Sequence, residues 1–142
     1  MARPTKLTPA RQKDIEEAIL AGNYFGAACE YAGIDERTGY NWMARGRDEL
    51  ARRENPRVKE GTAQWEKEED FVQFFQTITR ASARVEVRVV AKIQQAGDED
   101  WRALAWFMEH RYPTKWGKHV NEHTGKDGKA IIIQTAQNMD EL

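Results

Sequence analysis

Several polar side chains share one expected helix face, and their types suit contact with DNA bases. The run from Asp35 to Gly46 predicts a helix, and a period of about 3.6 residues per turn directs Ile34 and Trp42 inward. Arginine can bond two acceptors of guanine, asparagine can bond adenine, and tyrosine can contact a phosphate or a thymine methyl group. We therefore predict six DNA-contacting residues: Arg37, Thr38, Tyr40, Asn41, Arg45 and Arg47.

A helix-turn-helix would carry this face into a major groove. Residues 27–32 are mostly small and let one helix approach another, and Gly33 suits a turn with positive φ. Asp35 can then cap the second helix, with Trp42 as its buried anchor. Gly39 departs from the motif, because glycine within a helix costs ~1 kcal/mol relative to alanine. Either another backbone packs closely at Gly39, or the helix is locally soft until DNA binds.

An ordinary core helix with a solvated polar face is the competing interpretation of this stretch. The small-residue run and the glycine turn before the helix favour the DNA-binding interpretation. A supporting helix is expected from Thr8 to Ala21, and Asn23 is expected to cap the next helix. Tyr24 and Phe25 are expected to complete the small core.

The charge balance predicts weak DNA binding by one copy. The 142 residues carry a formal net charge of -1, and residues 1–59 hold 11 Lys or Arg against 9 Asp or Glu. Neutralised phosphates supply most of the non-specific affinity for DNA. The polar run from residue 47 to 64 reads as a linker or a frayed helix end, and its basic residues suit either phosphate contact or a solvated connector.

A second module is predicted after that linker. Apolar residues spaced by four and three predict a helix of about 27 residues from Asp70 to Ala96, and Trp101 to Tyr112 predicts a shorter helix with apolar residues nearly all round. Together they predict a long antiparallel α-hairpin for oligomerisation, with Trp116 folded back as a plug. The residues expected at subunit contacts are Phe71, Phe75, Ile78, Val85, Val89, Ile93, Trp101, Leu104, Trp106 and Met108.

The whole chain is accordingly predicted to be mainly α, in four parts. They are a DNA-binding domain over residues 1–58, a linker over 59–64, the oligomerisation domain over 65–117 and a C-terminal tail over 118–142. The run AIIIQTA predicts a strand or hairpin in the tail, which would pair between subunits or with a partner, or order on binding.

No catalytic, cofactor or metal site is expected. Cys29 lies among small residues and is interpreted as a core residue. His119 and His123 have no evident third ligand, and Gly125 with Lys126 lacks the remaining residues of a phosphate-binding loop. No run approaches the ~20 apolar residues of a membrane span.

The stretches WMARG, FVQFFQTITRASARVEVRVVAKI and DWRALAWFMEHRYPTKWG resemble the small terminase subunits of tailed bacteriophages. The resemblance covers about residues 8–117 and is most specific in the last stretch. It implies a non-enzymatic, ring-forming protein that recognises the viral packaging site on double-stranded DNA. It also implies recruitment and regulation of a large terminase subunit, which carries the ATPase and nuclease, in the cytoplasm of the infected bacterium.

Two other classes fit the same DNA-binding stretch. A dimeric transcriptional regulator would read two half-sites one DNA turn apart. The DNA-binding subunit of a transposase would use the long helix as a zipper. The number of copies in the assembly distinguishes these classes from a ring.

Overall fold

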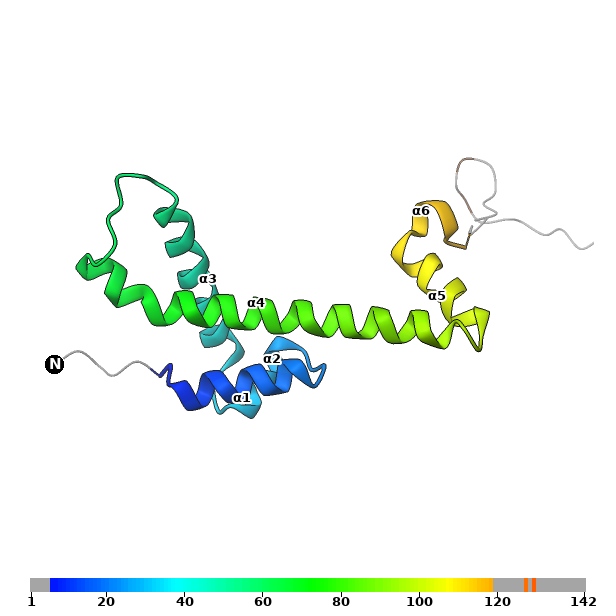
Figure 1. Cartoon of the computed structure of the whole chain (residues 1–142), viewed down its shortest axis with the longest axis horizontal. Coiled ribbons are helices and arrows are strands. Elements are labelled where there is room, and N and C mark those ends of the chain that lie inside the picture. The colour runs from blue at the N-terminus through cyan, green and yellow to red at the C-terminus, as the bar shows by residue number, and fades with distance from the viewer. Residues whose placement is uncertain (1–5, 119–126, 128, 130–142) are drawn as a thin grey trace, which may run out of the picture. The chain divides into compact units, whose positions relative to one another are not determined.

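The chain is helical through the part that the computed structural model describes, which is residues 6–118, 127 and 129. Those residues contain no strand, so the mainly α prediction is confirmed, while the predicted tail strand lies outside them. Two compact units divide the chain, residues 1–95 and residues 96–142. The helices are α1 Pro9–Leu20, α2 Phe25–Tyr31, α3 Glu36–Arg53, α4 Ala63–Ala96, α5 Trp101–Arg111 and α6 Pro113–Trp116 (Figure 1).

Glycines in left-handed backbone terminate the first two helices. Gly22 after α1 has a φ of 99°, and its N–H donates to the Ile19 carbonyl at 2.8 Å. Gly33 after α2 has a φ of 75°, and the next N–H, of Ile34, donates to the Cys29 carbonyl at 3.0 Å. These bonds satisfy carbonyls that the last helical turn leaves without partners. Both turns are therefore short and fixed by the backbone itself.

Asn23 does not cap α2, which corrects the prediction. Its side-chain amide donates to the Ala18 carbonyl at 3.0 Å and so ties down the end of α1. The N-cap of α2 is Tyr24, which makes no side-chain capping bond and is exposed rather than part of the core. Phe25 is half-buried and packs against the core, as expected.

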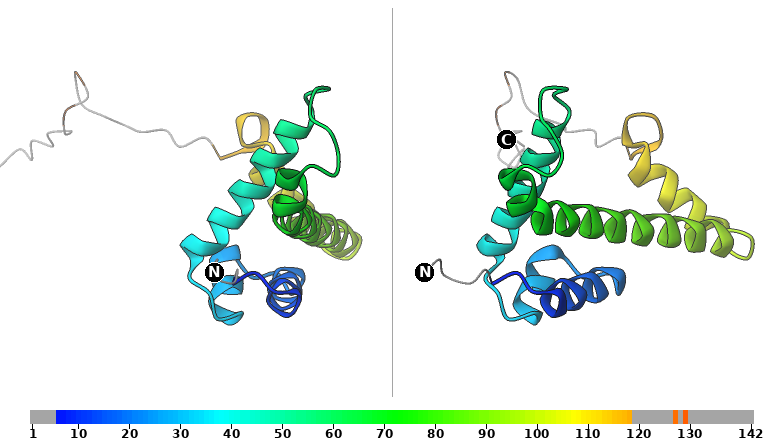
Figure 2. Two further views of the ribbon diagram at one scale, coloured as in Figure 1. Left: turned by 90° about the vertical axis from the view of Figure 1, so that its left-hand side faces the viewer. Right: turned by 60° about the vertical axis from the view of Figure 1, so that its left-hand side comes forward.

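One hydrophobic core joins the first four helices. Phe74 of α4 is fully buried, and its ring centroid lies 5.6 Å from that of Trp42 on α3, edge to face. α1 lies alongside α4, and the guanidinium of Arg88, in the second half of α4, donates to the Leu20 carbonyl at the end of α1 at 2.7 Å (Figures 1 and 2). The other buried members of the core are Leu7, Ile15, Ile19, Ala28, Cys29, Ile34, Phe71, Ile78 and Ala81.

α3 crosses the first half of α4 at Gly46. A Cβ atom there would collide with the Phe71 carbonyl oxygen and lie 2.6 Å from the Phe75 Cβ atom. Figures 1 and 2 show the two helices crossing steeply. Instead of fraying after Gly46, α3 continues to Arg53, because its second half packs on α4.

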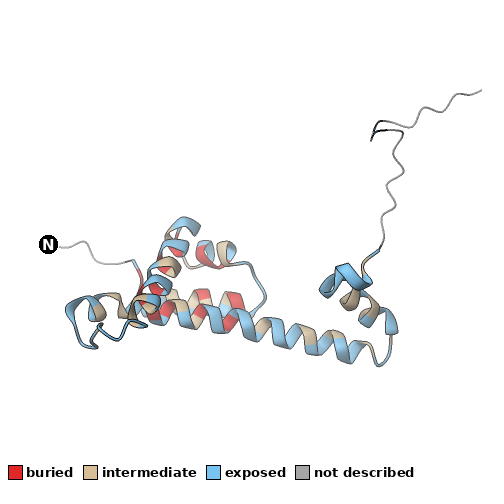
Figure 3. Ribbon diagram, turned by 90° about the horizontal axis from the view of Figure 1, so that it is seen from above, coloured by how far each residue is buried: buried red, intermediate tan, exposed pale blue. Residues whose placement is uncertain are grey.

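α4 has 34 residues, so it is longer than predicted and begins at Ala63 rather than near Asp70. Its extra turns carry Trp65 and two glutamates that bind arginines of α3. Its buried residues lie between Phe71 and Ala81, whereas Val87 and Val89 further along the helix are exposed (Figure 3).

The burial of two α4 residues corrects part of the predicted oligomer interface. Phe71 and Ile78 were expected at subunit contacts, but they are buried in the core of their own unit. The residues of the predicted linker, 59–64, do not separate two units either, because the first unit extends to residue 95. A fragment of residues 1–58 would lack the α4 contribution to this core, so an independent domain with that boundary is not expected to fold.

The second unit contains α5 and α6. Asp100 caps α5, accepting a hydrogen bond from the Arg102 backbone N–H at 3.0 Å. A Cβ atom on Gly97 would collide with the Leu104 side chain, so glycine is required where the chain turns into α5. α5 ends at Arg111, within one residue of the predicted end at Tyr112, and Pro113 begins α6.

Large apolar side chains of α5 are exposed in the part of the chain that the structure describes. α5 has no buried residue, and its tryptophans Trp101 and Trp106 are exposed. Trp116 lines a hollow with Trp101 and Met108, yet it is itself exposed and so does not act as the predicted plug. The antiparallel hairpin remains a prediction.

Replacing Gly46 with alanine tests the α3–α4 crossing. We expect Gly46→Ala to lower the free energy of unfolding by ~1–3 kcal/mol, because the added carbon meets backbone atoms of α4 that cannot move aside locally. Alanine would otherwise stabilise an α-helix. Urea unfolding followed by circular dichroism measures the change.

Gly26→Ala is the matched control in α2. Its added carbon would meet only the carboxylate end of Glu36, a flexible exposed side chain, at 2.9 Å. We expect that variant to be as stable as the original protein or slightly more so. Equal effects of the two substitutions would contradict the close crossing.

Candidate nucleic-acid interface

The first turn of α3 is set by its cap. The Asp35 carboxylate accepts the Arg37 backbone N–H at 2.8 Å, as predicted, and Ile34 and Trp42 are buried as expected. This fixes the rotation of the helix, so the opposite face is directed to solvent. Arg37, Tyr40 and Asn41 are exposed on that face, whereas Thr38 is half-buried at its edge.

Gly39 is explained by the approach of α2. A Cβ atom on Gly39 would collide with the Cys29 sulfur and lie 3.1 Å from the Phe25 ring. Close packing is therefore the alternative that holds, although the contact is with side chains of α2 rather than its backbone. Burial, and secondarily the nearby Glu36 carboxylate, raises the pKa of the Cys29 thiol to about 11. The thiol therefore stays protonated near neutral pH and serves as a small packing group.

Three side chains of the exposed face are arranged for contact with a ligand. Arg37 and Asn41 are four residues apart and thus neighbours on the helix surface. Neither side chain has a hydrogen-bond or ion-pair partner within the described part of the chain. The Tyr40 ring lies edge to face with Phe25, with centroids 4.8 Å apart, which orients it. Such a trio can donate and accept hydrogen bonds in a DNA groove.

Arg45, predicted to contact DNA, is instead engaged with α4. Its guanidinium donates two hydrogen bonds to the Glu68 carboxylate, at 3.0 and 2.6 Å, and lies 3.7 Å from the centroid of the Phe71 ring. Both partners lie more than 20 residues further along the chain, so helical periodicity could not reveal them. Arg47 pairs with its neighbour Asp48 at 3.1 Å, but both groups are well exposed and the pair is easily screened.

A charged cluster at the end of α3 was not foreseen. Glu49 is buried and accepts hydrogen bonds from Arg52 at 2.7 and 2.6 Å and from Arg53 at 3.0 Å. Hydrogen bonds from Arg52, opposed by burial, lower the pKa of the Glu49 carboxyl below its ordinary value.

Arg53 extends this cluster to α4. Its guanidinium lies 3.6 Å from the Trp65 ring centroid, donates to the Trp65 carbonyl at 3.0 Å and forms an ion pair with Glu69 at 2.9 Å. Glu69 has no other polar contact at that oxygen, so this is an ion pair rather than an aligned hydrogen bond. From the sequence, Arg52 and Arg53 suited either phosphate contact or a solvated connector. In the structure Arg53 holds α3 against α4, and Arg52 binds Glu49 of its own helix. In the sequence, the signal for these contacts was the group of glutamates that follows Trp65, because carboxylates and an aromatic ring are the partners that arginine binds.

The charge near the exposed face of α3 is nearly balanced. Between residues 25 and 48 the sequence has three arginines against four acidic residues. With Arg45 engaged by Glu68, one copy offers few cations to a phosphate backbone, so its affinity for DNA should be low.

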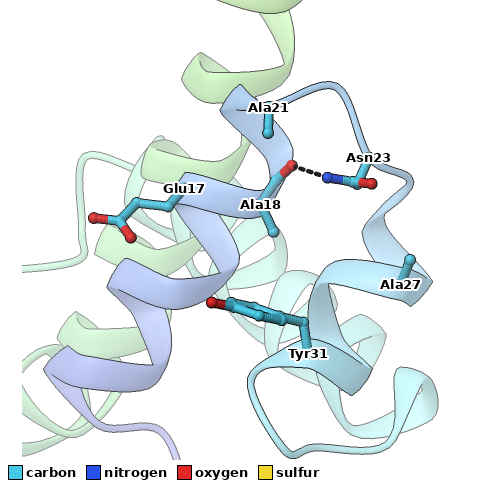
Figure 4. Close-up of a pocket in the computed structure, with 6 residues that line it drawn as sticks. All are labelled: Glu17, Ala18, Ala21, Asn23, Ala27 and Tyr31. Carbon is cyan, nitrogen blue, oxygen red and sulfur yellow. Dashed lines mark hydrogen bonds between the residues drawn. The ribbon is translucent and has the colours of Figure 1, made fainter.

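A hollow of about 310 Å³ lies between α1 and α2 and does not form a reactive site (Figure 4). Figure 4 shows the Tyr31 ring lying across it, with the hydroxyl directed toward α1. Half of its lining residues are alanines, and its one carboxylate belongs to Glu17. Within the described residues, no three metal-ligating side chains come together.

Comparisons with protein-family models, curated proteins and solved structures gave no match to this chain. No helix in the described ranges combines the length and apolar character needed to cross a membrane. The assignment of a function therefore depends on the exposed face of α3, the uncovered apolar side chains and the resemblance in sequence.

The Glu49 cluster predicts a pH-dependent contribution to stability. Because the folded-state pKa of Glu49 is depressed, its contribution should be complete well above the ordinary value of 4.5 and should fade as the pH falls from there through the folded pKa. We expect Glu49→Gln to lower the unfolding free energy at pH 7, and the difference from the original protein to shrink under acidic conditions.

Thermal unfolding across the pH range tests this expectation. Glu60→Gln, in the exposed connector between α3 and α4, is the control and should leave the profile unchanged. A constant difference between Glu49→Gln and the original protein from neutral to acidic pH would show that the carboxylate charge is not the cause.

Proposed function

We propose that this chain is a small terminase subunit that binds viral packaging-site DNA and assembles into a ring. The observation that carries the proposal is the unpartnered pair Arg37 and Asn41 on the solvent face of α3. In this proposal α2 and α3 form a helix-turn-helix, and the first half of α3 enters the major groove. The resemblance in sequence supplies the class of protein.

Assembly would compensate for the weak binding of one copy. Several modules presented to one DNA molecule act at high effective concentration, and avidity can exceed single-site affinity by ~100 to 10,000-fold. Gly46 and the core residues of α4 attach α3 to the long helix, so the modules would not be tethered through a flexible connector. The spacing of DNA contacts would then follow from the subunit spacing in the ring.

The uncovered aromatic side chains support self-association. Trp101, Trp106 and the exposed valine Val89 present apolar surface that a single chain leaves in water. Burial of such surface between copies is favourable in proportion to its area. Leu104 is also exposed, and Val85, Ile93 and Met108 are half-buried, so they complete the set offered to a neighbouring subunit.

The remaining features of the proposal come from the resemblance. The protein would act without catalytic chemistry of its own, in the cytoplasm of the infected host, by recruiting and regulating the large terminase subunit. Its C-terminal tail is a candidate for that contact. A dimeric regulator or a transposase subunit would use the same face of α3, and the number of assembled copies distinguishes them.

Native mass spectrometry of the full chain tests the assembly. We expect one closed species of many copies, and we expect Trp106→Ala to shift it toward smaller species, because an aromatic residue at a subunit contact contributes ~2–4 kcal/mol. Tyr24→Ala removes an even more exposed aromatic residue, at the N-cap of α2, and should leave the assembly intact. A dimer would favour the regulator, and a monomer at micromolar concentration would contradict both.

The preference of the protein for packaging-site DNA over random DNA tests whether the α3 face contacts bases. We expect the double variant Arg37→Ala and Asn41→Ala to lose preference for the packaging-site DNA more than affinity for random DNA, with ~1–3 kcal/mol of discrimination for each base contact. Competition binding at one salt concentration measures both quantities. Equal losses on the two DNAs would mean that these side chains contact phosphates.

A further inference from the structure

We propose that Arg45 is a latent phosphate-binding residue of the DNA interface, which Glu68 of α4 holds back. The inference rests on the proposed function of the α3 face. Its starting point is that, among the described residues, Arg45 alone of the predicted DNA-contacting residues pairs with a carboxylate far along the chain.

The position of Arg45 on α3 suits a phosphate. It is four residues after Asn41, so the two are neighbours on the helix surface. It is also eight residues after Arg37, or about 12 Å along the helix axis at 1.5 Å per residue. The major groove is about 12 Å wide, so a helix with Arg37 near the bases brings Arg45 near the phosphates at its edge.

A comparison with Arg53 shows why Arg45 can exchange partners. The Arg53 side chain is 10% exposed and binds Glu49, Glu69 and the Trp65 carbonyl, which makes it a fixed part of the fold. The Arg45 side chain is 43% exposed and has one carboxylate partner. The Glu68 side chain is only 15% exposed, so the open end of this pair is the Arg45 guanidinium. At that end salt can screen the pair and another anion can take the place of Glu68.

There is also room beside Arg45 for a phosphate to replace Glu68 as its partner. A hollow of about 310 Å³ lies beside Arg45, with walls that include Asp48, Arg52 and Glu68. The carboxylates of this hollow repel a phosphate while Arg45 is paired, and Arg52 is engaged by Glu49. Removal of the Glu68 charge would both release Arg45 and reduce that repulsion.

The test measures the affinity of the full-length protein for a short DNA duplex of random sequence as salt is varied. We expect Glu68→Gln to bind about five-fold more tightly at ~0.1 M salt, and the salt slope to steepen by about 0.9 for each engaged copy, as one added phosphate contact predicts. Adding Arg45→Ala to Glu68→Gln should remove this increase.

Glu66→Gln is the matched control. It makes the same charge change on the same helix, at an exposed carboxylate that has no ion-pair partner among the described residues. An equal increase for Glu66→Gln and Glu68→Gln, or an increase that persists without Arg45, would overturn the proposal, because a general charge effect would explain it. An unchanged affinity of Glu68→Gln would also overturn it.

A folding check and a second variant make the result of the binding test interpretable. Circular dichroism establishes that each variant folds, and if Glu68→Gln does not, Arg45→Lys replaces it. Lysine cannot form the two parallel bonds to Glu68, so it should bind DNA more tightly than the original protein, and an unchanged affinity would overturn the proposal. If the original protein binds no DNA, or binds it independently of Arg37, the proposed function fails. If that binding exists and only the Glu68 effect is absent, this inference alone fails.

Discussion

The close crossing of α3 and α4 at Gly46 is the constraint on which the first unit depends. Because this position has no side chain, the Phe71 backbone and the Phe75 side chain of α4 can approach α3 directly. That approach brings Phe74 against Trp42 and closes a core that none of the four helices could form alone. The orientation of the exposed α3 face is therefore fixed by a contact on the opposite side of the same helix.

The arginines of α3 divide between the fold and the solvent according to their partners on α4. Arg53 is enclosed by an aromatic ring and two carboxylates, so its charge is a structural element. Arg37 has an open environment and remains available to a ligand. Arg45 lies between these cases, exposed on one side and paired on the other. The count of basic residues therefore overstates the positive charge that this surface offers to DNA.

Apolar side chains show the same division along α4 and α5. Most of those between Phe71 and Ala81 of α4 are buried in the core, whereas Val87 and Val89 further along the helix and the tryptophans of α5 remain exposed. Water solvates such surface poorly, so it is the natural contact region for other copies. One long helix thus serves the core of the first unit at one end and offers apolar surface at the other.

The sequence by itself determined the features that depend on neighbouring residues. Capping by Thr8, Asp35 and Asp100, the turns at Gly22 and Gly33, and the inward position of Trp42 follow from short-range hydrogen bonds and helical periodicity, and all are present in the structure. Only the tertiary structure decided the partners of Arg45, the burial of Phe71 and Ile78, and the continuation of α3 beyond Gly46. The apolar spacing in α4 indicated a packed face without indicating whether the partner was another helix of the same chain or another copy. The physical reason is that ion pairs, ring stacking and burial arise between segments distant in sequence, and a local pattern carries no information about which segments meet.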